Sequence, residues 1–208
     1  MNDRIAWLAR RDGTVILGKG PFTAVAEPPA DGVAFYKRGF ASQEEMPWWI
    51  PSDFQRMPVE EFQRMNAVMD APVIRWETPD AMPFSFVFQE IMACIHQGQI
   101  EKTVPVVTEV GEAGVAVGKA VMSAMASQSA PLYSYGWASE EGGFAGATPE
   151  LLFSLDGLRL ETAALAGTAR REDEAVFGVD EKEIREHEYV AQTLVSKLLD
   201  LGTLQRKE

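Results

Sequence analysis

The sequence predicts an α+β fold built on a largely antiparallel β-sheet with flanking helices. Short apolar runs of strand length are joined mostly by hairpin-type turns, and helical patterns occur between them at irregular spacing. A strict alternation of strands and helices is absent, and so is a glycine-rich phosphate loop. These observations disfavour a doubly wound parallel sheet.

The first part of the chain predicts strands and one short helix. The apolar runs Ile5–Leu8 and Thr14–Leu17 flank the turn residues 11–13, which reads as a hairpin. Further along we expect a strand, an extended crossing segment packed by two indoles, and a short helix, at Gly32–Tyr36, Pro47–Pro51 and Pro58–Val68 respectively.

The middle of the chain predicts two helices and two strands. Met82-Pro83 breaks the chain, Ser85 is placed to cap the next helix, and Gly98 is placed to end it. Its apolar positions follow the spacing i, i+3, i+4, i+7, at Phe88, Ile91, Met92 and Ile95. We then expect a strand, a helix of small residues with Val117, Val121 and Ala124 on one face, and a strand, at Thr103–Thr108, Glu112–Ser129 and Leu132–Trp137.

The last part of the chain predicts a hairpin and a long helix. Leu151–Leu155 and Leu158–Ala163 flank Asp156-Gly157, a pair typical of a type I′ turn. The helix is expected to start near Asp180 and to end at Gly202. Its apolar stripe is formed by Ile184, His187, Ala191, Leu194, Val195 and Leu198.

Composition limits the classes of function. The chain has 208 residues, and its formal net charge of −12 argues against nucleic acid or anionic membranes as partners, since both bind basic patches. No signal-peptide pattern or membrane-length apolar run is present, and the only cysteine, Cys94, has no partner for an intrachain disulfide. We therefore expect a cytoplasmic protein with a single domain over residues 1–208.

Two residues are candidates for acid–base chemistry. Glu150 precedes the apolar run Leu151-Leu152-Phe153, where partial desolvation would favour the protonated carboxyl and suit it to act as an acid. Lys102 opens the valine-rich segment, and desolvation in a pocket would favour its neutral form, a base. The alternatives are an exposed glutamate at a strand end and an exposed edge lysine, and each remains open on these residues alone.

Two further sets could bind a cation and an anion. Glu183 and Glu186 are three residues apart and share a helical face, which suits Mg²⁺, although Glu183 also fits a capping box with Asp180. Gly167 and Thr168 could bind a carboxylate through backbone N–H groups and a hydroxyl, or form a plain turn.

The order of these segments is more specific than any one of them. GATPELL, then ETAALAGTARR, then DEKEIREH closely resembles the signature of the chorismate-utilising enzymes, and GQIEKTVPVV resembles the family segment that carries a catalytic lysine. The motifs cover about residues 85–200. The family includes isochorismate, salicylate and anthranilate synthases and aminodeoxychorismate synthase component I.

The resemblance implies a role for each residue. Lys102 would activate a water for attack at C2 of chorismate, and Glu150 would protonate the departing C4 hydroxyl. Glu186 would bind Mg²⁺, supported by Glu183, and the metal would hold the ring carboxylate that Gly167 and Thr168 contact. A bound Mg²⁺ would let so acidic a protein hold a dicarboxylate.

Residue 166 favours one reaction within the family. Aminodeoxychorismate synthases commonly carry a nucleophilic lysine at this position, whereas Ala166 cannot form that adduct, which argues for water as the nucleophile. The resemblance therefore implies isochorismate synthase, with the other family activities, or a catalytically silent chorismate-binding module, as alternatives.

The sequence differs from the family pattern in two places. The arginine that usually follows five residues after the lysine is Val107 here, and Pro105 removes a strand hydrogen-bond donor. The family continues past the last helix into a CGEIR-like region with another metal glutamate. The chain is therefore expected to correspond to the N-terminal half to two-thirds of such a domain, without its C-terminal part.

Overall fold

The chain forms two compact units. The computed structural model describes residues 4–41, 43–67, 73–114, 117–126, 132–139, 142–167, 170–173, 178 and 180–205. Unit 1 comprises Met1–Gln128 and Ser134–Gly146, and unit 2 comprises Ser129–Tyr133 and Ala147–Glu208. The secondary structure of the described residues is mixed, with both helices and antiparallel strands, which confirms the predicted α+β class.

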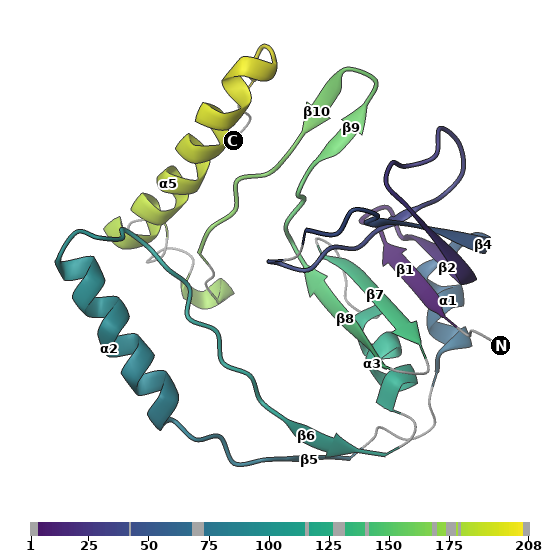
Figure 1. Cartoon of the computed structure of the whole chain (residues 1–208), viewed down its shortest axis with the longest axis horizontal. Helices are drawn as coiled ribbons and strands as arrows, with labels where there is room; N and C mark the ends of the chain where they lie inside the picture. The colour runs from purple at the N-terminus through teal and green to yellow at the C-terminus, as the bar shows by residue number, and fades with distance from the viewer. Residues whose placement is uncertain are drawn as a thin grey trace. The chain divides into compact units, whose positions relative to one another are not determined.

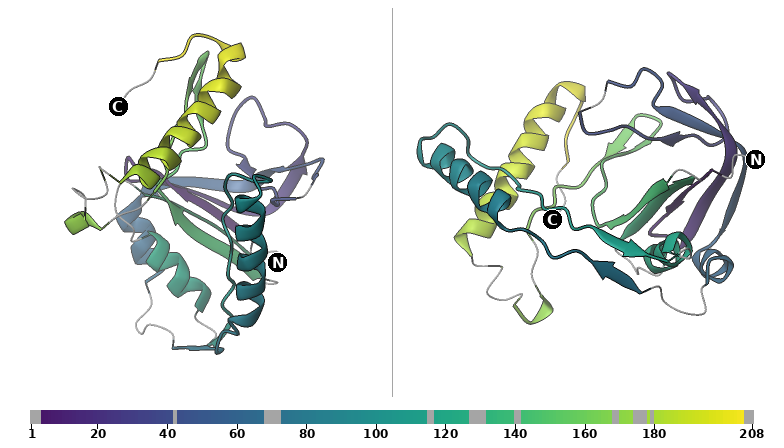
Figure 2. Two further views of the ribbon diagram at one scale, coloured as in Figure 1. Left: turned by 90° about the vertical axis from the view of Figure 1, so that its left-hand side faces the viewer. Right: turned by 60° about the horizontal axis from the view of Figure 1, so that its bottom comes forward.

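The main sheet has six strands in the order β3-β4-β2-β1-β7-β8, and it curls as it crosses from one edge to the other (Figure 1; Figure 2). The pairings of β1 with β2 and β7, and of β4 with β2 and β3, are all antiparallel. The strands are β1 Ile5–Ala9, β2 Thr14–Val25, β3 Phe35–Tyr36, β4 Trp48–Pro58, β7 Tyr133–Ser139 and β8 Gly142–Thr148.

Two strand predictions are extended or shortened by the structure. The hairpin of β1 and β2 is confirmed, and Gly13 occupies its turn with φ of 78°, a conformation that favours glycine. The segment predicted as an extended crossing piece is the start of the long strand β4, because β4 pairs with β2 from Trp48 to Pro58. The strand predicted at Gly32–Tyr36 is confined to Phe35–Tyr36.

The core of unit 1 lies on one face of this sheet. Its largest fully buried side chains are Trp7, Phe62 and Val15, and the rings of Trp7 and Phe62 lie 5.8 Å apart. Phe62 comes from helix α1, Val59–Met65, which falls within the helix predicted over Pro58–Val68. Gly136 lies directly beneath Trp7, because a Cβ there would be 1.8 Å from the indole ring.

The second helix of this core differs from its prediction. The described part of helix α3 is Val117–Ala126. The predicted start at Glu112 is wrong, because Gly111–Ala113 form strand β6, paired with β5 at Ile74–Trp76. Among the side chains of α3 that the structure describes, Met122 is buried, whereas Val121, a member of the predicted apolar face, is 36% exposed. Residues 127–131 lie outside the described part of the chain.

Helix α2, Met82–His96, begins earlier than expected. Its N-cap is Ala81, and the Ser85 hydroxyl donates to the Ala81 carbonyl oxygen at 2.9 Å, so the prediction that Ser85 caps the helix is wrong. Pro83 explains the difference, because proline is tolerated in a first helical turn and so need not break the chain. The predicted end is confirmed, since Gly98 follows the helix with φ of 68°.

Unit 2 contains a small hairpin and the longest helix. The hairpin is formed by β9, Ser154–Asp156, and β10, Arg159–Glu161. Asp156 pairs with Arg159, so the two loop residues are Gly157 and Leu158 and not Asp156 and Gly157 as predicted. Only Gly157 has positive φ, at 56°, whereas a type I′ turn needs positive φ at both loop residues. Helix α5, Glu181–Leu198, follows the short turn η1, Arg171–Asp173, and leads into η2, Leu199–Leu201.

Candidate functional site

Lys102 lies in unit 1, in an exposed segment without regular secondary structure. The strand predicted at Thr103–Thr108 is wrong: residues 102–110 form no strand, and the chain enters β6 only at Gly111. Pro105 gives a physical reason, because proline cannot donate to a strand ladder. Lys102 itself is exposed in this structure and does not occupy the desolvated position that its predicted role as a base requires.

Glu150 lies in unit 2, just after the end of β8. Its backbone N–H donates to the Thr148 hydroxyl oxygen at 3.1 Å, which shapes the turn around Pro149. Strand β9 begins only at Ser154, so Glu150 does not lie at the start of an apolar strand as expected. The Glu150 side chain is exposed.

A hydroxyl joins the two motif segments of unit 2. Thr162 Oγ1 donates to the carbonyl oxygen of Leu152 at 2.7 Å and to that of Leu151 at 3.4 Å. This bond ties the residues after Glu150 to the ETAALAGT segment. Thr162 was not among the predicted site residues, although it lies within Leu158–Ala163, the predicted second strand of the hairpin.

Gly167 has φ of 79°, a conformation that favours glycine, and it is exposed. Thr168, its expected partner in carboxylate binding, lies outside the described residues.

Glu183 and Glu186 lie on the first turns of α5, where the predicted capping residue is confirmed. The Asp180 carboxylate accepts from the backbone N–H groups of Lys182 at 2.8 Å and Glu183 at 3.1 Å. The helix thereby begins at Glu181, and the spacing of three residues places Glu183 and Glu186 on one face. Glu183 and Glu186 are both partly buried, whereas Glu150 is exposed.

The acidic residues at the start of α5 affect the pKa of Lys182. Lys182 Nζ donates to Glu183 Oε1 at 3.1 Å, and this hydrogen bond raises the pKa of Lys182 above its ordinary value. The charges of Glu183 and Glu186 raise that pKa further. Lys182 was not predicted as part of the site. Its position next to Glu183 in the sequence was the signal that could have indicated it.

The donor chemistry of this helix turn fits Mg²⁺ as one part of a coordination shell. Mg²⁺ prefers carboxylate and water oxygens and is usually held by one or two carboxylates together with substrate. Glu183 and Glu186 would supply two such carboxylates, and Glu183 already holds the Lys182 ammonium. Across the described ranges, no cluster of three or more His, Cys, Asp or Glu side chains is arranged to hold a metal ion.

The predicted site residues thus divide between the units. Lys102 belongs to unit 1, whereas Glu150, Gly167, Glu183 and Glu186 belong to unit 2. Only the two helix glutamates are brought onto one face by a single element. Within the described residues, no helix is long and apolar enough to span a membrane.

Comparison with known proteins gives one finding about the family. A family model described as chorismate binding enzyme matches residues 48–207, which is more than half of the chain. Searches of curated proteins and of solved structures gave no significant match. The match contains all the motif segments described above. The chain therefore belongs to the chorismate-binding enzyme family.

Proposed function

We propose that this chain carries the catalytic segments of an isochorismate synthase, a Mg²⁺-dependent isomerase that converts chorismate to isochorismate. The observation that supports this reaction within the family is Ala166, because its methyl side chain offers no nucleophile and leaves that role to water.

In the proposed reaction, water adds to C2 of chorismate and the hydroxyl at C4 departs. Lys102, in its neutral form, takes a proton from the attacking water. Glu150, in its protonated form, gives its proton to the C4 hydroxyl, which leaves as water while the ring double bond shifts. One water is consumed and one is released, so the product is an isomer of the substrate.

The anionic substrate needs positive charge at the acidic start of α5. Bound Mg²⁺ would supply that charge to the ring carboxylate, with Glu183 and Glu186 as protein ligands. Gly167 and Thr168 would contact the same carboxylate. Further ligands would come from water and from the substrate.

The exposure of Lys102 and Glu150 favours a second candidate function. Neither residue is desolvated in this structure, whereas acid–base catalysis here requires a neutral lysine and a protonated glutamate. A chorismate-binding module without turnover of its own would tolerate both exposed positions.

The decisive experiment measures product formation from chorismate with Mg²⁺ by liquid chromatography. We expect the protein to form isochorismate from chorismate when Mg²⁺ is supplied. Glu150→Gln should lower kcat by about 10²–10⁴-fold, because it removes the proton donor. Glu60→Gln, at an exposed glutamate of α1 outside the motif segments, is the matched control and should retain full activity.

Each other outcome identifies a different function. No isochorismate from the protein, with Glu150→Gln equal to wild type, would exclude the proposed reaction. If chorismate still bound in calorimetry, the silent module would be supported. Salicylate with pyruvate would identify a salicylate synthase, and aminated products formed with ammonium would identify an anthranilate or aminodeoxychorismate synthase.

A further inference from the structure

An aromatic cluster lies on the face of the unit 1 sheet opposite the Trp7 core. Trp137 pairs with Ala6, one residue from Trp7, so its ring projects from the other face. The ring centroid of Trp137 lies 4.7 Å from that of Phe22 and 5.3 Å from that of Trp49. These rings come from β2, β4 and β7, which brings together three distant parts of the chain.

A lysine stands over this cluster. Lys37 Nζ lies 4.8 Å from the ring centroid of Trp137 and 5.4 Å from that of Trp49, within the range of cation–π attraction. Lys37 directly follows β3 and is half-buried. Its backbone N–H donates to the Pro47 carbonyl oxygen at 2.9 Å. None of the ion pairs found among the described residues involves Lys37.

The same cluster contains a second hydrogen-bond donor. The Trp49 Nε1–H group is buried and has no hydrogen-bond partner in the part of the chain that the structure describes. A buried donor of this kind is rare in folded proteins and calls for a ligand, an ion or a water. Trp7 Nε1 is also buried and unpaired, but among the described residues no cation lies over the Trp7 ring.

We propose that Lys37 and the Trp49 indole N–H bind a small organic carboxylate at this aromatic cluster. A carboxylate can accept from an ammonium and an indole N–H together, and hydrogen bonds between charged groups are the stronger kind. The surrounding rings lower the local dielectric, which strengthens the attraction to Lys37. None of the residues proposed to act on chorismate belongs to this cluster, so the two proposals can fail separately.

Benzoate is the probe, and the indole N–H resonances of the ¹⁵N-labelled protein are the readout. The chain has five tryptophans, and Trp49→Phe assigns the resonance of Trp49. We expect benzoate to shift the Trp49 Nε1–H resonance downfield in a saturable way, because the N–H gains an acceptor. Benzamide, which has the same ring without the charge, should bind at least about tenfold more weakly, as expected when a charged hydrogen bond is lost.

Substitutions at Lys37 complete the test. Lys37→Met should weaken benzoate binding at least about tenfold, whereas Lys37→Arg keeps the charge and should retain binding. Lys19→Met, at a lysine of β2 outside the cluster, is the matched control. The proposal is overturned if Trp49 shifts no more than the other indoles, or if benzoate and benzamide bind alike. If Lys37→Met fails to fold, Lys37→Arg and the comparison of benzoate with benzamide still test whether the site binds a carboxylate.

Discussion

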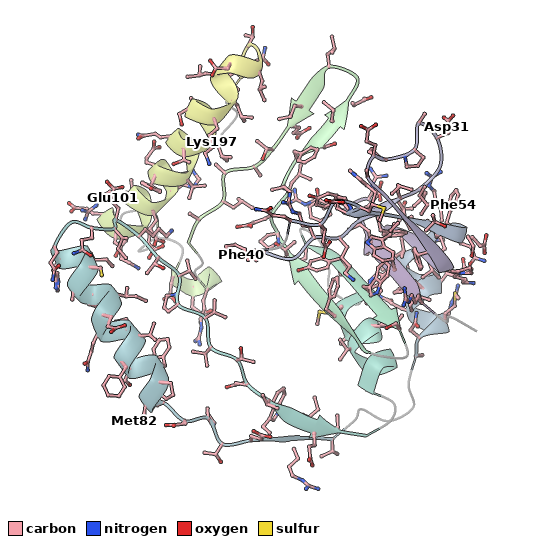
Figure 3. All side chains as sticks on the ribbon, viewed as in Figure 1. Asp31, Phe40, Phe54, Met82, Glu101 and Lys197 are labelled. Atoms are coloured by element: carbon pink, nitrogen blue, oxygen red, sulfur yellow. The ribbon has the colours of Figure 1, made fainter. Side chains whose placement is uncertain are left out.

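Units 1 and 2 bury their apolar side chains to very different extents. Among the described residues, all that are buried belong to unit 1, with the single exception of Ala191 on α5. In unit 2, Leu158 and Leu152 are 105% and 81% exposed. Unit 1 also exposes some apolar residues, such as Phe40 in the loop before β4, but it has a continuous core as well (Figure 3).

The difference separates stability from chemistry. Unit 1 is held by hydrophobic burial around Trp7 and Phe62. The elements of unit 2 are held by local hydrogen bonds, such as those of Thr162 and Asp180. Most of the residues proposed to act on chorismate lie in unit 2, so substitutions can change one property without the other.

The largest expected effect tests the core of unit 1. Phe62→Ala should lower the free energy of unfolding by about 3–5 kcal/mol, because it removes a fully buried ring and leaves a cavity beside Trp7. Leu158→Ala, at a fully exposed position of unit 2, should change it by less than about 0.5 kcal/mol. Urea unfolding followed by tryptophan fluorescence measures both. Equal effects would remove the distinction between the units.

An intermediate effect tests the local bonds of unit 2. Asp180→Ala should destabilise the start of α5 by about 1 kcal/mol, because the backbone N–H groups of Lys182 and Glu183 lose their acceptor. Faster amide hydrogen exchange at those two residues is the measurement, and Asp180→Asn, which keeps an accepting oxygen, should exchange nearly as wild type. A matching loss of protection in β1 and β2 would show that the two units unfold together.

The smallest effect tests a local bond of unit 1. The Thr14 backbone N–H donates to the Asp12 carboxylate at 3.0 Å, and this bond is the main reason that the pKa of Asp12 lies below its ordinary value of 3.8. A lowered pKa stabilises the folded state above the pKa of the unfolded chain, and this contribution disappears as pH falls through the folded pKa. We therefore expect the β1–β2 turn to loosen only in acid.

The matched variant separates the two causes at Asp12. Arg10→Gln should raise the pKa of Asp12 only slightly, because the charge of Arg10, 3.5 Å away, contributes less than the backbone hydrogen bond. Carbon-13 titration of the Asp12 carboxyl measures this. An ordinary pKa in wild type, or full loss of the shift in Arg10→Gln, would contradict the assignment.

Predictions from sequence succeeded where the signal is local. The β1–β2 hairpin follows from apolar runs around Asp12-Gly13, and the start of α5 follows from Asp180 as a capping residue. Both depend on hydrogen bonds between residues a few positions apart. The placement of Glu183 and Glu186 on one helical face was predictable for the same reason.

Predictions failed where a distant partner decides the structure. Residues 103–108 have the composition of a strand but pair with no other strand in the described chain, whereas β4 continues to Pro58 because β2 pairs with it along that length. Propensity favours a strand without supplying its neighbour. The exposure of Lys102 and Glu150 was unpredictable for a related reason, since burial depends on which other segments cover a residue.

The sequence by itself determined the order of the family motifs, the class of fold and the local start of α5. These depend on residue identity at short spacing, and hydrogen bonds and turn geometry act over the same range. Only the tertiary structure decided that Met122 faces the core and that Gly136 lies under Trp7. It also placed Lys37 over the indoles of Trp49 and Trp137. Such contacts join residues from separate strands, and strand order and register are set by the burial of whole faces, which no short segment encodes.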